Sequence, residues 1–399
     1  MNKEIKRIFI VLSLFSFAGG LFYNFQQLWL LDNNLSVKTI GIVLSLGALL
    51  SVSTIFLCSN LVKQNRLKNL VSILLLLKAL TIVSLFCLNS SGLNIIIKFL
   101  TMLDYVLDVE IYASIYPMIS IISQDDKLYA KRGLFYSTFY YISVLLTGFL
   151  LGKNILNFNI NYNFYLLLAS IFIFIAFFIL NNTNIEKYHK SNKKDNDNDI
   201  LFKLLTKIKT DIISKNYLAF IFFGDVAYYI VQSLLMIILT KYVGFSPTFA
   251  SNFILTLGIS AVVLATLILE KFTFKNNYLN LFLKYGIRLI NYIIAVILCN
   301  KTSYLLAMIY LMLSAESYTH VSHAPYINRF KDEYQFAFSN LSEIISYLAR
   351  SIGTLLCSLL IEINLRFVFI VAIIFTILQI IFAFRALKLK NEESMVQYD

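Results

Sequence analysis

Long runs of apolar residues recur along the chain, and each is followed by a short polar segment. A helix of about 20 mostly apolar residues is long enough to cross the hydrocarbon core of a bilayer. Twelve runs approach or exceed that length, at residues 8–31, 38–62, 69–88, 95–122, 134–152, 163–181, 217–240, 248–270, 278–299, 303–327, 339–361 and 366–385. The pattern predicts an all-α membrane protein with twelve transmembrane helices.

The composition agrees with that fold class. Hydrophobic residues make up 59% of the chain and charged residues 14%, with a mean hydropathy of +0.74. A soluble domain has about 45–50% apolar and about 25% charged residues. A soluble enzyme of this size is excluded, because it could not hide so much apolar surface from water. The run at 8–31 is too long for the apolar part of a cleaved signal, so it is predicted to be the first span.

The basic residues predict the orientation in the membrane. Of the 34 Lys and Arg residues, 24 lie in the N-terminus, the segments after the even-numbered spans and the C-terminal tail, and 5 lie after the odd-numbered spans. Cytoplasmic loops carry the excess of Lys and Arg, so both termini of a multi-pass plasma-membrane protein are expected in the cytoplasm. The same bias explains the net charge of +12, and no basic stripe with interleaved aromatic residues indicates nucleic acid binding.

The chain divides into two similar halves. The predicted parts are a first six-helix bundle at 1–181, a solvated cytoplasmic linker at 182–216, a second six-helix bundle at 217–390 and a cytoplasmic tail at 391–399. A weak internal repeat relates the halves, since Glu110 and Tyr112 in the fourth span correspond to Glu316 and Tyr318 in the tenth. A parallel duplication of this kind occurs in secondary transporters.

With two six-span halves, a long segment between them and matching polar features in spans 1 and 7 and in spans 4 and 10, nearly the whole chain resembles the major facilitator superfamily of secondary transporters. The resemblance implies that spans 1, 4, 7 and 10 line a central cavity and that spans 3, 6, 9 and 12 lie outermost. The family motif between spans 2 and 3 is matched at Leu61 and Lys68, whereas Lys63 replaces its Asp.

Span 4 carries three acidic residues, and charges inside a membrane usually face a cavity or a partner. Asp104 and Asp108 lie one helical turn apart, so they share a face of the helix. Tyr105 and Tyr112 are expected on that face, with Glu110 nearly opposite. These carboxylates are candidates for proton uptake and substrate contact, with Asp108 first. The alternative is that they only pair with a cation of a neighbouring span.

Span 10 carries Glu316, His320 and His323 on one helical stripe. Histidine titrates near neutrality, so the stripe could relay protons or contact substrate. The alternative is a polar lining held by hydrogen bonds. A metal site is disfavoured because the chain has only three His, and neither a metal nor another cofactor is predicted.

Buried cations in neighbouring spans suggest ion pairs. Lys78 in span 3 could pair with Asp104 or Asp108. Arg288 in span 9 or Arg350 in span 11 could pair with Glu316. These three basic residues are therefore candidates for buried ion pairs.

Further polar stripes complete the predicted substrate and proton pathway. Hydrogen bonds between helices are the alternative reading of any one stripe. The stripes are Gly20, Asn24 and Gln27 in span 1, Asp225, Tyr229 and Gln232 in span 7, and Tyr136, Tyr140, Ser143 and Thr147 in span 5.

These features predict a transporter that works by alternating access, and no enzyme motif is present. Acidic groups and tyrosines favour a small cationic or amphipathic substrate, with proton-coupled efflux as the first expectation. The alternatives are uptake of a nutrient such as a sugar or peptide, or a membrane sensor or assembly factor that transports nothing. The expected partners are the substrate, protons and the lipid bilayer, and the expected state is a monomer.

Overall fold

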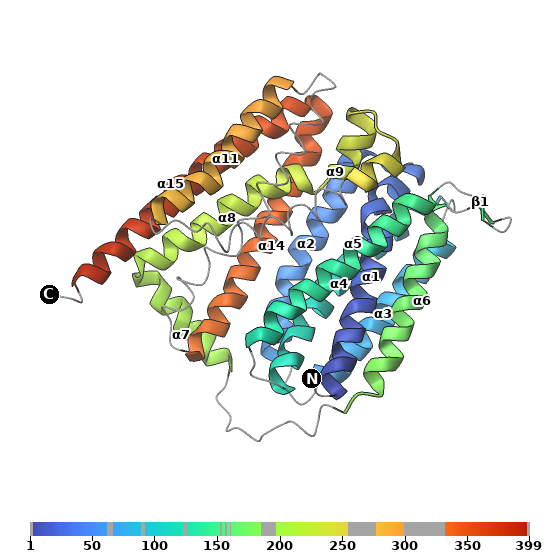
Figure 1. Cartoon of the computed structure of the whole chain (residues 1–399), viewed down its shortest axis with the longest axis horizontal. Coiled ribbons are helices and arrows are strands. Elements are labelled where there is room, and N and C mark those ends of the chain that lie inside the picture. The colour runs from blue at the N-terminus through green and yellow to red at the C-terminus, as the bar shows by residue number, and fades with distance from the viewer. Residues whose placement is uncertain are drawn as a thin grey trace. The chain divides into compact units, whose positions relative to one another are not determined.

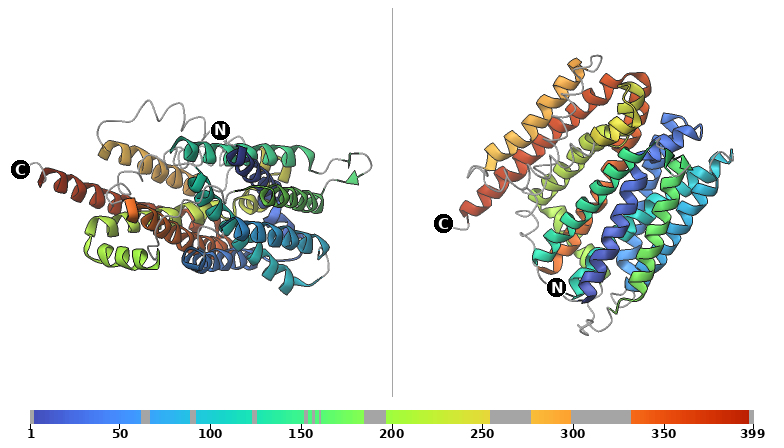
Figure 2. Two further views of the ribbon diagram at one scale, coloured as in Figure 1. Left: turned by 90° about the horizontal axis from the view of Figure 1, so that it is seen from below. Right: turned by 45° about the vertical axis from the view of Figure 1, so that its right-hand side comes forward.

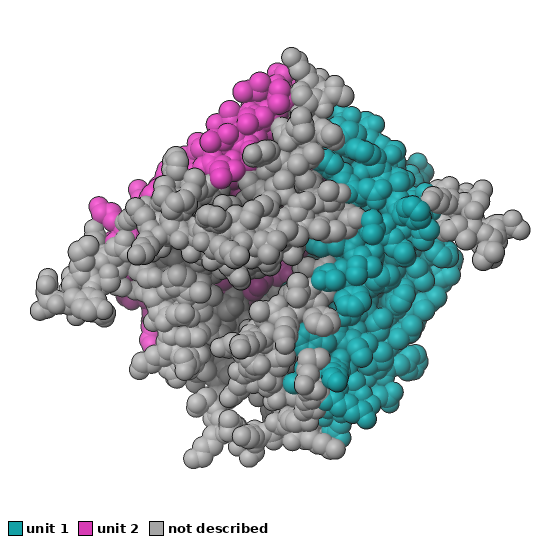
Figure 3. All heavy atoms as spheres, in the orientation of Figure 1, with its two compact units in different colours: residues 1–194, 236–255 teal, residues 195–235, 256–399 magenta. Residues whose placement is uncertain are grey.

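The computed structural model describes residues 3–61, 67–88, 92–122, 126–151, 154–155, 158–159, 161–184, 197–253, 277–298 and 332–396. Some side chains within these ranges, including that of Asn24, lie outside the described part. Within the described part the chain folds into two compact units, which Figure 3 colours separately. Unit 1 comprises residues 1–194 and 236–255, and unit 2 comprises residues 195–235 and 256–399.

Almost all of the described chain is helical (Figure 1). In the first part of the chain the helices are α1 (Lys3–Asp32), α2 (Val37–Leu61), α3 (Leu67–Cys87), α4 (Asn94–Ile122), α5 (Asp126–Leu150) and α6 (Tyr162–Asn181). Between α5 and α6, strand β1 (Asn154–Ile155) pairs antiparallel with β2 (Phe158–Asn159). The later elements are α7 (Asp197–Thr210), α8 (Ile212–Gln232), α9 (Leu235–Ile237), the π-helix η3 (Ile238–Tyr242), α11 (Asn277–Leu298), α14 (Asp332–Ile363) and α15 (Leu365–Val396).

The prediction of an all-α membrane protein is confirmed. Ten of the predicted spans coincide with described helices, and most helices extend a few residues beyond the apolar run. Seven of the described helices are long and apolar enough to cross a membrane. The span predicted at 303–327 lies outside the described residues, and the one at 248–270 is described only as far as Phe253.

The segment predicted as a solvated linker contains a helix. Within residues 182–216, α7 spans fourteen residues, and the side chain of Leu204 on that helix is completely buried. Residues 236–255 belong to unit 1, although they follow α8 in the sequence. The boundary between the two units therefore crosses the chain just after Leu235 as well as in the segment that links the halves.

In unit 1, α1 packs against α5 and α6, α3 packs against α4 and α6, and α2 packs against α4. In the right-hand view of Figure 2, α6 runs between α1 and α3. On α6, Ala169, Ile173 and Ala176 are completely buried, whereas Ile171 is 45% exposed and Phe178 is 61% exposed. An apolar face left outside the protein core is what a lipid-facing helix requires, because lipid tails solvate such side chains.

In unit 2, α8 packs against α14 and α15, and α11 packs against α15. Aromatic residues hold one end of this unit together. The rings of Tyr217 and Phe338 stack with centroids 5.8 Å apart, and those of Phe220 and Tyr285 meet edge to face at 5.5 Å. Aromatic pairs in these geometries are favourable beyond the area that they bury.

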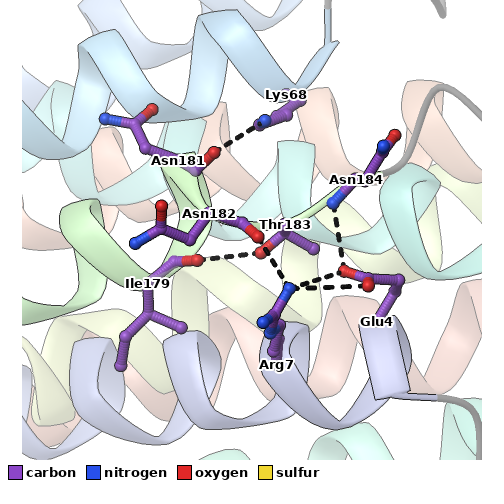
Figure 4. A network of polar contacts seen from close by, with 8 residues as sticks. All are labelled: Glu4, Arg7, Lys68, Ile179, Asn181, Asn182, Thr183 and Asn184. Atoms are coloured by element: carbon purple, nitrogen blue, oxygen red, sulfur yellow. Dashed lines mark hydrogen bonds and ion pairs between the residues drawn. The ribbon is translucent and has the colours of Figure 1, made fainter.

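The C-terminal end of α6 is capped by two basic side chains (Figure 4). Arg7 Nη1 on α1 donates to the backbone oxygen of Asn182 at 2.6 Å, and Lys68 Nζ on α3 donates to that of Asn181 at 2.9 Å. Carbonyl groups at a helix C-terminus have no partner within the helix, and a cation there also interacts favourably with the negative end of the helix dipole. The two contacts therefore fix the end of α6 against α1 and α3.

The chain just after α6 is held as well. The backbone N–H of Asn184 donates to Glu4 Oε2 at 3.0 Å, and the same carboxylate lies 3.4 Å from Arg7 Nη1 (Figure 4). Asn182 and Asn184 are consequently tied to the first turns of α1, directly after the end of α6.

Candidate transport site

Lys78 on α3 is a buried cation with several partners on neighbouring helices. Its side-chain ammonium donates to Asp104 Oδ1 at 2.9 Å and to the hydroxyl of Tyr23 at 2.7 Å. A third contact of 3.2 Å reaches the backbone oxygen of Asp104. These contacts use the three N–H groups of lysine, so the 3.4 Å contact with Asp108 Oδ1 is mainly electrostatic.

The two aspartates differ in their access to solvent. The side chain of Asp104 is completely buried, whereas that of Asp108 is 22% exposed. Asp104 Oδ2 also lies 3.5 Å from the hydroxyl of Tyr23, which can donate to it while accepting from Lys78. Asp104 is therefore the fixed counter-ion of Lys78, and Asp108 is the carboxylate that can exchange partners.

Helix geometry explains how these residues meet. Asp104 and Asp108 are spaced i, i+4, so both face α3 and can approach Lys78. Tyr105 does not share that face as expected, because it lies against Gly47 of α2. A Cβ atom added to Gly47 would come within 3.1 Å of the Tyr105 side chain. One residue along an α-helix turns the side chain by about 100°, which separates the two directions.

The cluster of Lys78, Asp104 and Asp108 contains one basic and two acidic side chains. With both carboxylates ionised, it carries one more negative than positive charge. An uncompensated buried charge costs several kcal/mol. Asp108, at 22% exposed, is the accessible member of this negatively charged cluster.

Tyrosine rings continue from the cluster along α4 and α5. The rings of Tyr112 and Tyr136 meet edge to face with centroids 4.9 Å apart, and Tyr136 stacks with Tyr140 at 6.3 Å. All three side chains are partly exposed. Tyrosine faces attract organic cations, so these rings can extend the contact that Asp108 begins.

The three residues of the stripe predicted on span 1 lie in different surroundings. Gly20 is a packing residue, because an added Cβ atom would lie 2.4 Å from the backbone oxygen of Tyr140 on α5. Gln27 is half-buried, and the side chain of Asn24 lies outside the described part. The residue of α1 that reaches the charged cluster is Tyr23, which we did not predict. Its only sequence signal is a hydroxyl-bearing aromatic residue beside Asn24 in an otherwise apolar span.

Two residues of the predicted stripe on α5 bond within their own helix. The hydroxyl of Ser143 donates to the backbone oxygen of Tyr140 at 2.7 Å, and that of Thr147 donates to Ser143. Both side chains are completely buried. These two hydroxyls therefore bond to the backbone of their own helix and not to a neighbouring helix. Glu110 on α4 is also buried, at 3% exposed.

In unit 2, Arg288 on α11 is 4% exposed. Its guanidinium donates to Gln379 Oε1 on α15 at 3.2 Å and to the backbone oxygen of Gly224 on α8 at 3.3 Å. The ring of Tyr228 lies 5.9 Å away. Among the described residues, no carboxylate lies within ion-pair distance of Arg288. Glu316, the expected partner, lies outside the described residues, as do His320 and His323.

The stripe predicted on span 7 lies on α8. Asp225, Tyr229 and Gln232 are all partly exposed. The guanidinium of Arg350 on α14 lies over the ring of Tyr229, 5.0 Å from its centroid. A cation at this distance from a tyrosine face is attracted by the ring. Within the described ranges, no three His, Cys, Asp or Glu side chains converge as a metal site would require.

Several solved transporter structures have the same fold. The nucleoside transporter NupG matches with a TM-score of 0.66 at 13% identity, over 97% of this chain and 99% of that chain. A bacterial homolog of the human lysosomal transporter Spinster, inward-facing and unoccupied, matches at 0.70 with 16% identity, over 97% and 98%. The peptide transporter POT in complex with alafosfalin matches at 0.67 with 11% identity, over 97% and 95%.

No protein-family model and no curated protein matches the chain in sequence. The structural matches nevertheless cover nearly the full length of both chains in each comparison. At identities this low, they establish the fold alone. The chain therefore has the fold of the major facilitator superfamily of secondary transporters.

Proposed function

We propose that the chain is a secondary transporter that exports a small cationic or amphipathic organic molecule in exchange for protons, by alternating access. The observation that carries the proposal is the asymmetric cluster around Lys78, in which Asp104 is sealed and Asp108 is partly exposed. A carboxylate of this kind can hold either a proton or a cation. The partly exposed rings of Tyr112 and Tyr136 support a substrate with organic character.

The transporters that share the fold support a small-molecule substrate, since their names refer to nucleosides, peptides and lysosomal transport. The charge bias of the sequence supports a multi-pass protein of the plasma membrane with both termini in the cytoplasm. Protease access to residues 185–196 in intact and opened cells tests this orientation. Cleavage of this segment by protease added to intact cells would show that it faces outward and would contradict the proposed orientation.

Reconstitution into proteoliposomes tests the coupling. We expect the protein to move at least one member of a panel of organic cations, nucleosides and dipeptides in response to a pH gradient. Asp108→Asn should abolish transport driven by the gradient but spare the exchange of labelled for unlabelled substrate, because that exchange needs no net proton movement. The matched control is Asp32→Asn, which removes an exposed carboxylate at the end of α1 and should keep both activities.

The same experiments test the direction of transport and the coupling role of the cluster separately. Substrate that moves in the same direction as protons would replace efflux by uptake. Gradient-driven transport that survives both Asp104→Asn and Asp108→Asn would remove the cluster from coupling. Failure to move any compound, in protein shown to be folded, would favour a membrane sensor or assembly factor.

A further inference from the structure

The corner between α7 and α8 has one apolar and one basic side. On α7, the apolar residues Leu204 and Ile208 are 0% and 7% exposed and join a core cluster with Tyr217 of α8 and Phe338 of α14. The apolar face of α7 is therefore already covered by unit 2. The opposite face of α7 is exposed on the surface of unit 2.

The exposed side of this corner carries three lysines. Lys207 and Lys209 lie in the last turn of α7, and Lys215 lies in the first turn of α8. All three are exposed. Ile212, between them in the sequence, is 60% exposed. The surface thus combines positive charges with one exposed apolar side chain.

The corner is rigidly built. Asp211 separates the two helices and caps the start of α8, where it accepts from the backbone N–H of Ile213 at 3.0 Å and from the hydroxyl of Ser214. Figure 1 shows the sharp turn of the chain between α7 and α8. A capped helix start and a docked α7 hold the lysines in a fixed arrangement.

The corner lies next to an apolar stretch long enough to span a membrane. By length and composition this stretch runs from Ile212 to Tyr242, so Lys209 and Lys215 lie near the expected start of the span. Lysines at such a point lie level with the lipid headgroups, while an exposed isoleucine can reach the acyl boundary. Clusters of basic residues beside a span attract anionic lipids, by roughly fivefold in affinity for each Lys.

We infer that the surface formed by Lys207, Lys209, Ile212 and Lys215 binds the headgroups of anionic phospholipids. The lysines hold the phosphate groups, and Ile212 lies among the acyl chains next to them. The contact anchors α7, and with it the chain that enters unit 2, to one leaflet of the bilayer. It is independent of the substrate and of proton coupling.

Native mass spectrometry of the purified full-length protein with phosphatidylglycerol tests the inference, together with thermal stability in phosphatidylcholine vesicles with and without phosphatidylglycerol. In the variant Lys207→Gln/Lys209→Gln/Lys215→Gln, we expect phosphatidylglycerol affinity to fall roughly tenfold to a hundredfold. The stabilisation of the wild-type protein by phosphatidylglycerol should disappear in this variant. The corresponding triple Lys→Arg variant should keep both properties, because it keeps the charge.

The matched control is Lys38→Gln/Lys241→Gln/Arg366→Gln, which removes three exposed cations from the segments after odd-numbered spans. This control should bind phosphatidylglycerol as the wild type does. Equal loss in the control and the α7–α8 variant would overturn the inference, because it would show a general effect of net charge. Unchanged lipid binding in the α7–α8 variant would also overturn it, as would competition by millimolar inorganic phosphate alone.

Discussion

Each unit buries a basic residue, in the third and the ninth of the predicted spans, but the surroundings of the two residues differ. Lys78 on α3 has two carboxylates and a tyrosine hydroxyl as partners. Arg288 on α11 has, within the described residues, an amide oxygen of Gln379 and a backbone oxygen. The first arrangement holds excess negative charge, whereas Arg288 donates to neutral oxygens and has the carboxylate of Asp225 only at longer range.

The largest expected effect compares the loss of each cation. Lys78→Met leaves the fully buried Asp104 without a counter-ion, which should cost about 3–5 kcal/mol of stability. Arg288→Met leaves neutral acceptors unpaired and removes a longer-range attraction for the partly exposed Asp225, which should cost about 1–3 kcal/mol. Thermal unfolding in one detergent measures both.

The double variant Lys78→Met/Asp104→Leu should recover much of the loss, because it removes the buried pair as a whole. A loss at Arg288→Met as large as that at Lys78→Met would contradict the comparison. Such a result would place a carboxylate beside Arg288, and Glu316 would be the first residue to test.

A second comparison concerns a glycine in each unit. Gly20→Ala would bring a Cβ atom within 2.4 Å of the backbone oxygen of Tyr140, which cannot turn away. We expect a cost of about 3 kcal/mol. Gly224→Ala would meet the side chain of Gln379, a flexible amide that can move only by giving up its hydrogen bond to Arg288. We expect a cost of about 2 kcal/mol there, measured in the same unfolding assay.

Gln379→Ala added to Gly224→Ala should relieve the overlap and restore part of the stability. Ser143→Ala added to Gly20→Ala should not, since the backbone of α5 would still be in the way. Equal rescue in the two units would show that α1 and α5 can separate more easily than their packing suggests.

The smallest effect compares two tyrosine hydroxyls. Tyr23→Phe removes an acceptor from the charged Lys78, which should cost about 2 kcal/mol. Tyr292→Phe removes a hydrogen bond to the neutral backbone oxygen of Ala227, which should cost about 1 kcal/mol. A reversed order, measured by the same unfolding assay, would show that the Tyr23 contact contributes little to holding the cluster.

The sequence was sufficient to predict where most of the described helices lie. A membrane span needs an apolar run of fixed length, so the ends of α2, α3 and α6 fall close to the ends of the runs. The amphipathic α7 was missed because it lies in a polar segment, and its few apolar residues are buried only through contact with unit 2.

The sequence was less informative about which side chains meet. The i, i+4 spacing of Asp104 and Asp108 placed both on one face, and that face meets Lys78. It did not reveal Tyr23 or Gln379, whose roles depend on how neighbouring helices are rotated. Helix periodicity gives the direction of a side chain relative to its own helix, whereas contacts between helices depend on packing that no local pattern records.

The contacts of residues 181–184 with α1 and α3 have a mechanical consequence. The chain is held at Asn184 by Glu4 and again from Asp197, where α7 begins and docks on unit 2. The thirteen residue steps between these points (197 − 184) have a contour length of at most about 45 Å. That length limits how far the two anchored ends can separate during any transport cycle. Each residue deleted between Asn184 and Asp197 should shorten the largest possible distance between these two residues by about 3.5 Å.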